Sequence, residues 1–117
     1  MPINRLAAAL LGLFTLSSAQ AACDVDLPGT WRVTHTSAST GGPKVAEDMP
    51  SEFTFAKNGS LHIQMGLVDV DSRYRCNGKT IVLEKAKPST LDIVAVDGPR
   101  IAWLERGQQR VFHLQRQ

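Results

Sequence analysis

Residues 27–35 read LPGTWRVTH, and this stretch predicts where the chain begins to fold. Its proline and glycine supply the fixed and the permissive backbone angles of a turn. The residues after the turn alternate large apolar with polar side chains, which is the period of a half-buried β-strand. Trp31, Val33 and His35 are therefore expected to share the inward face of a first strand.

The same unit, a short alternating run followed by a turn signal, recurs to the end of the chain. Asn58-Gly59 and Asn77-Gly78 are strong signals for tight hairpins. Closely spaced strands without a long helical pattern favour an antiparallel meander, and closing it into an up-and-down barrel removes unpaired edges. We therefore predict an all-β, eight-stranded antiparallel barrel, with an open or sandwich-like sheet as the alternative. Its strands are expected at residues 30–36, 52–56, 61–65, 68–76, 79–84, 90–96, 100–105 and 110–116.

The beginning of the chain has the pattern of a secretory signal. Arg5 precedes an uncharged apolar run at residues 6–16, and small residues follow up to Ala21. We expect residues 1–21 to be removed, leaving one domain at residues 22–117 that is periplasmic or secreted. The apolar run is shorter than the ~20 residues that span a bilayer, and no later run is longer, so no transmembrane segment is expected. Lipidation of Cys23 is an alternative export route.

The two cysteines are expected to pair. Cys23 and Cys76 are the only cysteines of a chain that is predicted to enter an oxidising compartment. Their disulfide closes a loop of roughly fifty residues, which is worth about 4 kcal/mol in the chain-entropy model. A redox or metal-binding pair of thiols is disfavoured because the spacing is not of the CxxC type.

The charge balance and the motifs argue against several classes of function. Thirteen Lys and Arg residues face eleven Asp and Glu residues, and this near-neutral balance argues against a nucleic-acid partner. Strand parity places His62 and His113 outward and His35 inward, so the three histidines are not expected to converge on a metal. There is no nucleophile elbow and no phosphate-binding loop. We expect no catalytic residue, no cofactor and no metal.

Three stretches resemble small bacterial lipocalin-like domains of the calycin group. They are Gly29-Thr30-Trp31, residues 55–59 and residues 112–116. The resemblance implies a barrel in which the tryptophan lies at the closed end and an arginine of the last strand packs across it. It assigns structural roles to Gly29, Trp31 and Arg116, with Arg110 as the competing arginine. A barrel of eight strands is only just wide enough to be filled by side chains or to hold one small ligand.

The interior is therefore expected to be either a ligand pocket or a filled core. As a pocket it is an apolar cup with two polar groups, which is typical of small-molecule sites. We predict a non-enzymatic exported binding protein for a small apolar or amphipathic ligand, held at the open end under residues 37–50. The predicted ligand-binding residues are Trp31, His35, Phe53, Phe55, Met65 and Tyr74.

A protein-interaction module is the rival class. Residues 74–78 resemble a stretch in small periplasmic inhibitors of lysozyme. A ligand carrier is expected to have a cavity lined by Trp31, Phe53 and Met65. An inhibitor is expected to have a filled core and to act through its loops.

Overall fold

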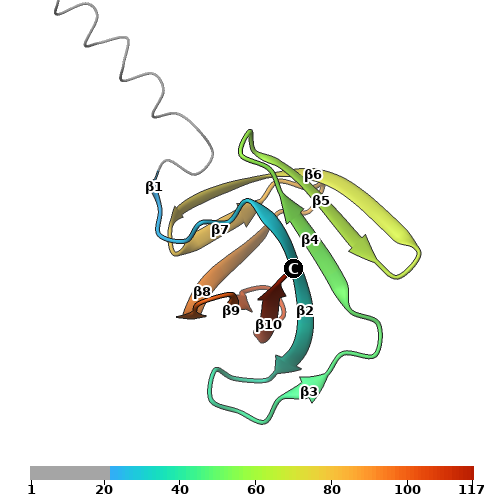
Figure 1. Cartoon of the computed structure of the whole chain (residues 1–117), viewed down its shortest axis with the longest axis vertical. Helices are drawn as coiled ribbons and strands as arrows, with labels where there is room; N and C mark the ends of the chain where they lie inside the picture. The colour runs from blue at the N-terminus through green and yellow to red at the C-terminus, as the bar shows by residue number, and fades with distance from the viewer. Residues whose placement is uncertain (1–21) are drawn as a thin grey trace, which may run out of the picture.

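The computed structural model describes residues 22–117, which form a β-barrel (Figure 1). The predicted signal peptide, residues 1–21, lies outside the described residues. Two further strands of two residues each, β1 (Ala22–Cys23) and β3 (Val45–Ala46), pair with strands of the wall. The wall consists of β2 (Gly29–Ser37), β4 (Ser51–Phe55), β5 (Ser60–Met65), β6 (Val68–Gly78), β7 (Thr80–Leu83), β8 (Ser89–Asp97), β9 (Arg100–Glu105) and β10 (Arg110–Arg116).

The barrel is closed by the pairing of its first and last wall strands. The order around the wall is β6-β5-β4-β2-β10-β9-β8-β7, and β7 pairs again with β6. β10 runs antiparallel to β2, from Val111 opposite Ser37 to Arg116 opposite Trp31. The predicted eight-stranded antiparallel barrel is confirmed, and the open-sheet alternative is wrong.

Both predicted hairpins form, with turn positions that differ from the prediction. In the first, the Gly59 amide donates to the Ala56 carbonyl over 3.1 Å, and Gly59 has the only positive φ of that turn, 93°. In the second, Asn77 is already paired with Thr80, so the turn itself consists of Gly78 and Lys79. In both hairpins the asparagine keeps a negative φ and only the glycine adopts the left-handed conformation.

The closed end of the barrel is built on Trp31. Its ring is 0% exposed, and its indole Nε1 donates to the Leu27 carbonyl over 2.9 Å. The Arg116 guanidinium lies 4.2 Å from the centre of the Trp31 ring, in cation–π geometry. Arg116, and not Arg110, therefore covers the tryptophan.

Gly29 makes room for this arginine. Arg116 Nη1 donates to the Pro28 carbonyl over 2.8 Å, and Nη2 donates to the Asp26 carbonyl. Gly29 has a φ of 128°, and a Cβ at this position would lie 2.8 Å from Arg116 Nη1. Any side chain here would strain the backbone and displace the guanidinium.

The predicted disulfide is confirmed. Cys23 and Cys76 are bonded with their Cα atoms 5.1 Å apart. β1 lies parallel to the end of β6, with Ala22 opposite Asn77 and Cys23 opposite Gly78. The bond holds the start of the described chain at the closed end. Because lipidation would use the Cys23 sulfur, the disulfide-bonded form has no thiol to acylate.

The predicted inward orientation of His35 is wrong. Val33 is paired with Leu114 and His35 with His113, which is the next residue of β10, so Thr34 is an extra residue in β2. An inserted residue turns the later side chains of the strand to the opposite face of the sheet. Thr36 is consequently buried on the inner face at 3% exposure, opposite Phe112, while His35 points out of the barrel.

Candidate ligand-binding site

Aromatic rings fill the middle of the barrel. Phe55 meets Tyr74 edge-to-face, with ring centres 4.8 Å apart, and also lies 6.3 Å from Trp103. Phe53 meets Trp103 edge-to-face at 5.2 Å. Phe55, Tyr74 and Trp103 are buried, whereas Phe53 is half-buried. The rings therefore fill the barrel from Trp31 up to Phe53, and space remains beyond that level.

A cavity of about 330 Å³ occupies this remaining space, at the end of the barrel opposite Trp31. We call it the mouth cavity. Its volume is near the lower end of the ~300–1,000 Å³ of small-molecule sites. The apolar side chains that line it come from all eight wall strands: Val33, Phe53, Ile63, Met65, Val70, Leu83, Leu91, Trp103 and Phe112.

The rim of the mouth cavity is polar. Lys85, Glu105 and Gln108 line it together with two serines, Ser51 and Ser89. The Glu105 carboxylate accepts a hydrogen bond from the backbone N–H of Gln108. Lys85 is exposed and belongs to none of the ion pairs found within residues 22–117. An apolar floor under a polar rim suits a ligand with one apolar and one polar end.

The shortness of β7 leaves the mouth open on one side. β7 has four residues, and its register with β6 extends only from Tyr74 to Asn77. Residues 68–72 of β6 pair with β5 on one edge only. The β5–β6 hairpin therefore projects from the barrel, on the side opposite β1 (Figure 1).

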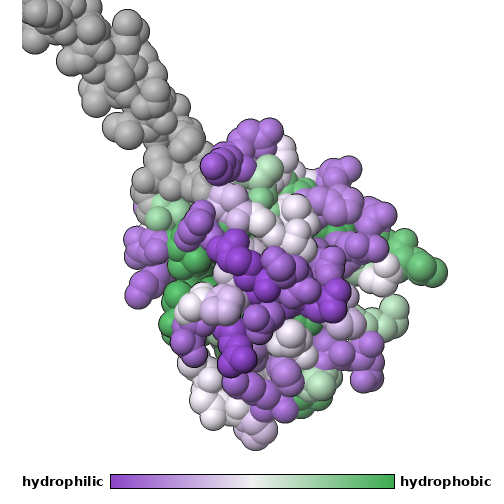
Figure 2. All heavy atoms as spheres, viewed as in Figure 1, coloured by the Kyte–Doolittle hydropathy of each residue, from purple (hydrophilic) through white to green (hydrophobic). Residues whose placement is uncertain are grey.

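The projecting hairpin exposes apolar side chains. Leu67 is fully exposed, and Val68 and Met65 are about half exposed. The space-filling view shows hydrophobic atoms where the tip of this hairpin projects (Figure 2). Met49 is also exposed, and its Cε lies 2.7 Å from the position of a Cβ built on Gly66 at the same tip. The mouth cavity is therefore continuous with an apolar surface.

The structure brings two of the six predicted ligand-binding residues to the mouth cavity. Phe53 forms part of its wall and Met65 lies at its edge. Trp31 and Phe55 are buried nearer the closed end, and His35 points out of the barrel. The mouth cavity is thus lined by Phe53 and Met65 but not by Trp31.

The Tyr74 side chain is held inside the barrel, away from the mouth cavity. Its ring is buried and its hydroxyl donates to the Ala56 carbonyl over 2.7 Å. Burial raises the pKa of the Tyr74 phenol, and the nearby Asp26 charge raises it further. The hydroxyl is held by the backbone and does not line the mouth cavity.

Trp103 and Phe112 line the mouth cavity and were not among the predicted ligand residues. Both carry a signal that was available in the sequence. Trp103 alternates with Ile101 and Glu105 along β9, and Phe112 alternates with Leu114 along β10. Applying the same parity rule to these two strands places both rings inside.

Residues 38–50 do not line the mouth cavity, so this cavity does not lie under the connection below which the ligand was expected. The reason is that β3 pairs with the edge of β2, with Ala46 opposite His35 and Val45 opposite Thr36. The Glu47 amide continues this pairing by donating to the Thr34 carbonyl over 3.0 Å. The connection therefore extends the wall beside β4 and does not cover its opening.

Comparison of the chain with protein-family models, with curated proteins and with solved structures finds no match. Within residues 22–117, no group of three or more metal-ligating side chains is arranged to hold an ion. In the same part of the chain, no helix has the length and apolar character needed to cross a bilayer.

Proposed function

We propose that this protein is an exported, non-enzymatic, lipocalin-like binding protein that holds a small apolar or amphipathic molecule in its mouth cavity. The observation that carries the proposal is an aromatic floor under a polar rim, in which half-buried Phe53 and Phe112 lie above buried Trp103. Burying such rings against a ligand removes apolar surface from water, at about 25 cal/mol per Å².

Other features support the lipocalin-like and exported parts of the proposal. A closed eight-stranded antiparallel barrel with Arg116 across Trp31 at one end is the arrangement that the family resemblance implies. The predicted leader and the Cys23–Cys76 disulfide support passage into an oxidising compartment.

A fluorescence titration of the processed protein, residues 22–117, with N-phenyl-1-naphthylamine tests ligand binding. This probe is uncharged and emits strongly only in an apolar site. We expect saturable binding that n-decanol displaces. The variant Phe53→Trp enlarges a side chain on the cavity wall and should weaken probe binding about tenfold, because the added ring occupies ligand volume.

The matched control is Val45→Trp. Val45 lies on β3, is 62% exposed and does not line the mouth cavity, so this variant adds the same side chain without filling it. Its affinity for the probe should equal that of the wild type. Absence of saturable binding, or equal weakening in both variants, contradicts the proposal.

The protein-interaction alternative is favoured by a different observation, the free edge of β6. Residues 68–71 have an unpaired edge beside the exposed Leu67 and Val68. An extended segment of a partner protein adds to such an edge by main-chain hydrogen bonds. Residues 74–78, which resemble lysozyme inhibitors, do not provide contacts through Tyr74 and Cys76, because both are buried.

A lysozyme activity assay separates the two functions. If the alternative holds, the processed protein inhibits the enzyme, Val68→Asp abolishes inhibition and Phe53→Trp retains it. Probe binding without inhibition of lysozyme argues for the carrier.

A further inference from the structure

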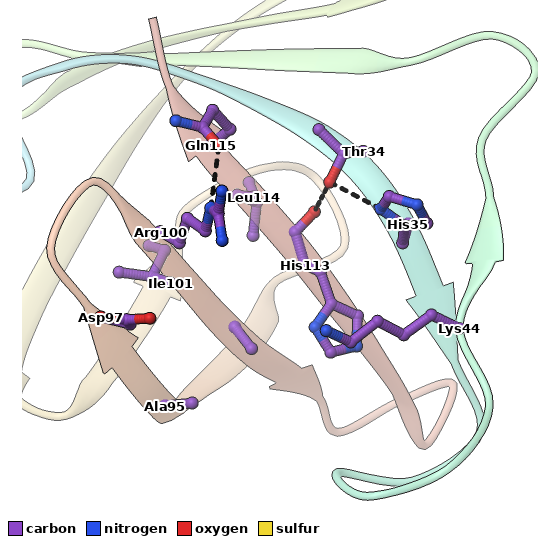
Figure 3. A pocket seen from close by; sticks show the side chains of 11 residues that line it. Thr34, His35, Lys44, Ala95, Asp97, Arg100, Ile101, His113, Leu114 and Gln115 are labelled. Atoms are coloured by element: carbon purple, nitrogen blue, oxygen red, sulfur yellow. Dashed lines mark hydrogen bonds between the residues drawn. The ribbon is translucent and has the colours of Figure 1, made fainter.

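A second hollow, of about 460 Å³, lies on the outside of the barrel over β2, β8, β9 and β10. We call it the outer groove. Figure 3 shows Lys44, His113 and His35 on one side of it, and Ala95 and Asp97 on the other. His35 and His113 are directly opposite each other in the register of β2 and β10. The bulge at Thr34 is what turns His35 to this face, and bulges are common beside functional sites.

A serine determines which nitrogen of His113 carries the proton. Ser37 Oγ donates its single proton to the Ser39 carbonyl over 2.8 Å. Ser37 Oγ also lies 2.9 Å from His113 Nε2, so in this contact Nε2 is the donor and the hydroxyl accepts. In neutral His113 the other nitrogen, Nδ1, is then an unprotonated acceptor, and it has no hydrogen-bond partner within residues 22–117.

A threonine orients His35 in the same way. Thr34 Oγ1 donates to the His113 carbonyl over 3.3 Å, so it accepts from His35 Nδ1 at 3.0 Å. The free nitrogen of His35 is Nε2. Each imidazole is thus held by a hydroxyl through one nitrogen and has its other nitrogen available to an outside partner.

The charges around the two rings favour an anion as that partner. Lys44 lines the groove on the same side as His113 and belongs to none of the ion pairs of the described residues (Figure 3). Arg100 also lines the groove, and its Nε donates to the neutral Gln115 side chain. Asp97 is the one acidic residue in the lining, and it stands on the side away from Lys44.

We propose that the outer groove is a second binding site, which takes the carboxylate of a small organic acid between Lys44 and His113. The apolar part of the acid lies along Ala95 and Ala102, which are paired across β8 and β9. Protonated His113 donates from Nδ1 to the carboxylate, and Lys44 supplies the second positive charge. This site is separate from the mouth cavity, and neither proposal depends on the other.

Binding of the acid is linked to the protonation of His113. Burial lowers the pKa of His113 below 6.5, and the charges of Lys44 and then of His35 lower it further. A carboxylate beside the ring offsets these effects, and linkage requires that the acid and the proton strengthen each other's binding. Affinity for the acid therefore rises as the pH falls toward the lowered pKa of His113.

The test is an NMR titration of the His113 ring in the processed protein, with butyrate as the probe. Butyrate should raise the pKa of His113 and should bind about fivefold more tightly near pH 5.5 than near pH 8. Lys44→Gln should weaken butyrate binding by a similar factor, about threefold to fivefold, and His113→Gln should abolish its pH dependence.

Three controls make the outcome decisive. His62→Gln removes an exposed histidine that does not line the outer groove and should leave butyrate binding unchanged. Butyramide has the shape of butyrate without its charge and should not bind. Equal affinity for butyramide, or an unchanged pKa of His113 at saturating butyrate, overturns the proposal. If inorganic phosphate binds as tightly as butyrate, the groove selects charge alone and the assignment to organic acids is wrong.

Discussion

The two ends of this barrel are built from the same alternating strands and reach opposite outcomes. At the closed end, Trp31 is fully buried, its indole N–H is bonded and Arg116 covers its ring. At the mouth, Phe53 and Phe112 are only half-buried and border a cavity. The closed end also carries the disulfide, whereas the mouth is bounded by the free edge of β6.

Stability and binding are therefore assigned to opposite ends of the barrel. The ring and polar groups of the closed end have partners within the chain, so changes there are expected to cost stability. The rings of the mouth have part of their surface facing the cavity, so changes there are expected to affect the ligand first. Variants at the two ends test this division.

The largest expected effect is on the closed end. Trp31→Ala removes a fully buried indole and should lower the free energy of unfolding by about 3–5 kcal/mol, the usual range for such substitutions. Phe112→Ala, at the mouth, should lower it by about half that amount or less, because its ring is already partly exposed. Urea unfolding followed by circular dichroism measures both values.

If Trp31→Ala and Phe112→Ala lower the free energy of unfolding equally, the closed end does not contribute more to stability than the mouth. Where Trp31→Ala does not fold, Trp31→Phe keeps most of the buried volume but loses the indole donor to Leu27. Trp31→Phe should still have a lower free energy of unfolding than Phe112→Leu.

The disulfide gives the next largest effect. Replacing both cysteines by alanine should lower the free energy of unfolding by about 2–4 kcal/mol, since the bond closes a loop across 53 positions of sequence. In the fraction that remains folded, affinity for the mouth probe should be unchanged, because the bond lies at the other end. A native-state affinity that falls along with the stability shows that the two ends are coupled.

The strands were predictable because their signals are local, whereas closure of the barrel depends on the distant pairing of β2 with β10 and was left open against an open sheet. Period-two alternation and glycine-containing turns each depend on only a few neighbouring residues, as residues 27–35 and the turn at Gly59 illustrate. The disulfide followed from the presence of a single pair of cysteines and the leader sequence.

The orientation of His35 was not predictable from alternation. Thr34, His35 and Thr36 are all polar, so no apolar side chain marks which face continues after Val33. A bulge inserted there leaves no signature in the sequence pattern, although it turns the side chains that follow it to the opposite face of the strand. The mouth cavity was likewise beyond local signals, because it depends on how far Trp103 fills the barrel and on the short pairing of β7 with β6.

The smallest expected effect is the pH dependence of stability that comes from two outward histidines. They are His113, beside the long connection, and His62, on β5. Asp71, whose carboxylate lies 2.7 Å from His62 Nδ1, raises the pKa of His62 above 6.5, with a further contribution from Asp69. The stabilising contribution of His62 is complete below pH 6.5 and is lost as the pH rises through its folded-state pKa.

His113 has the opposite sign. Burial lowers its pKa, so its neutral form is favoured by folding, and its contribution is complete above pH 6.5 and lost as the pH falls through the lowered value. The free energy of unfolding should therefore be measured from about pH 5 to about pH 8. His113→Gln should remove the decrease in this free energy that the wild type shows toward acid pH. His62→Gln should remove the decrease that it shows toward basic pH. A wild-type profile that both substitutions leave unchanged would show that neither imidazole has the environment described, and that would also remove the basis for pH-dependent binding in the outer groove.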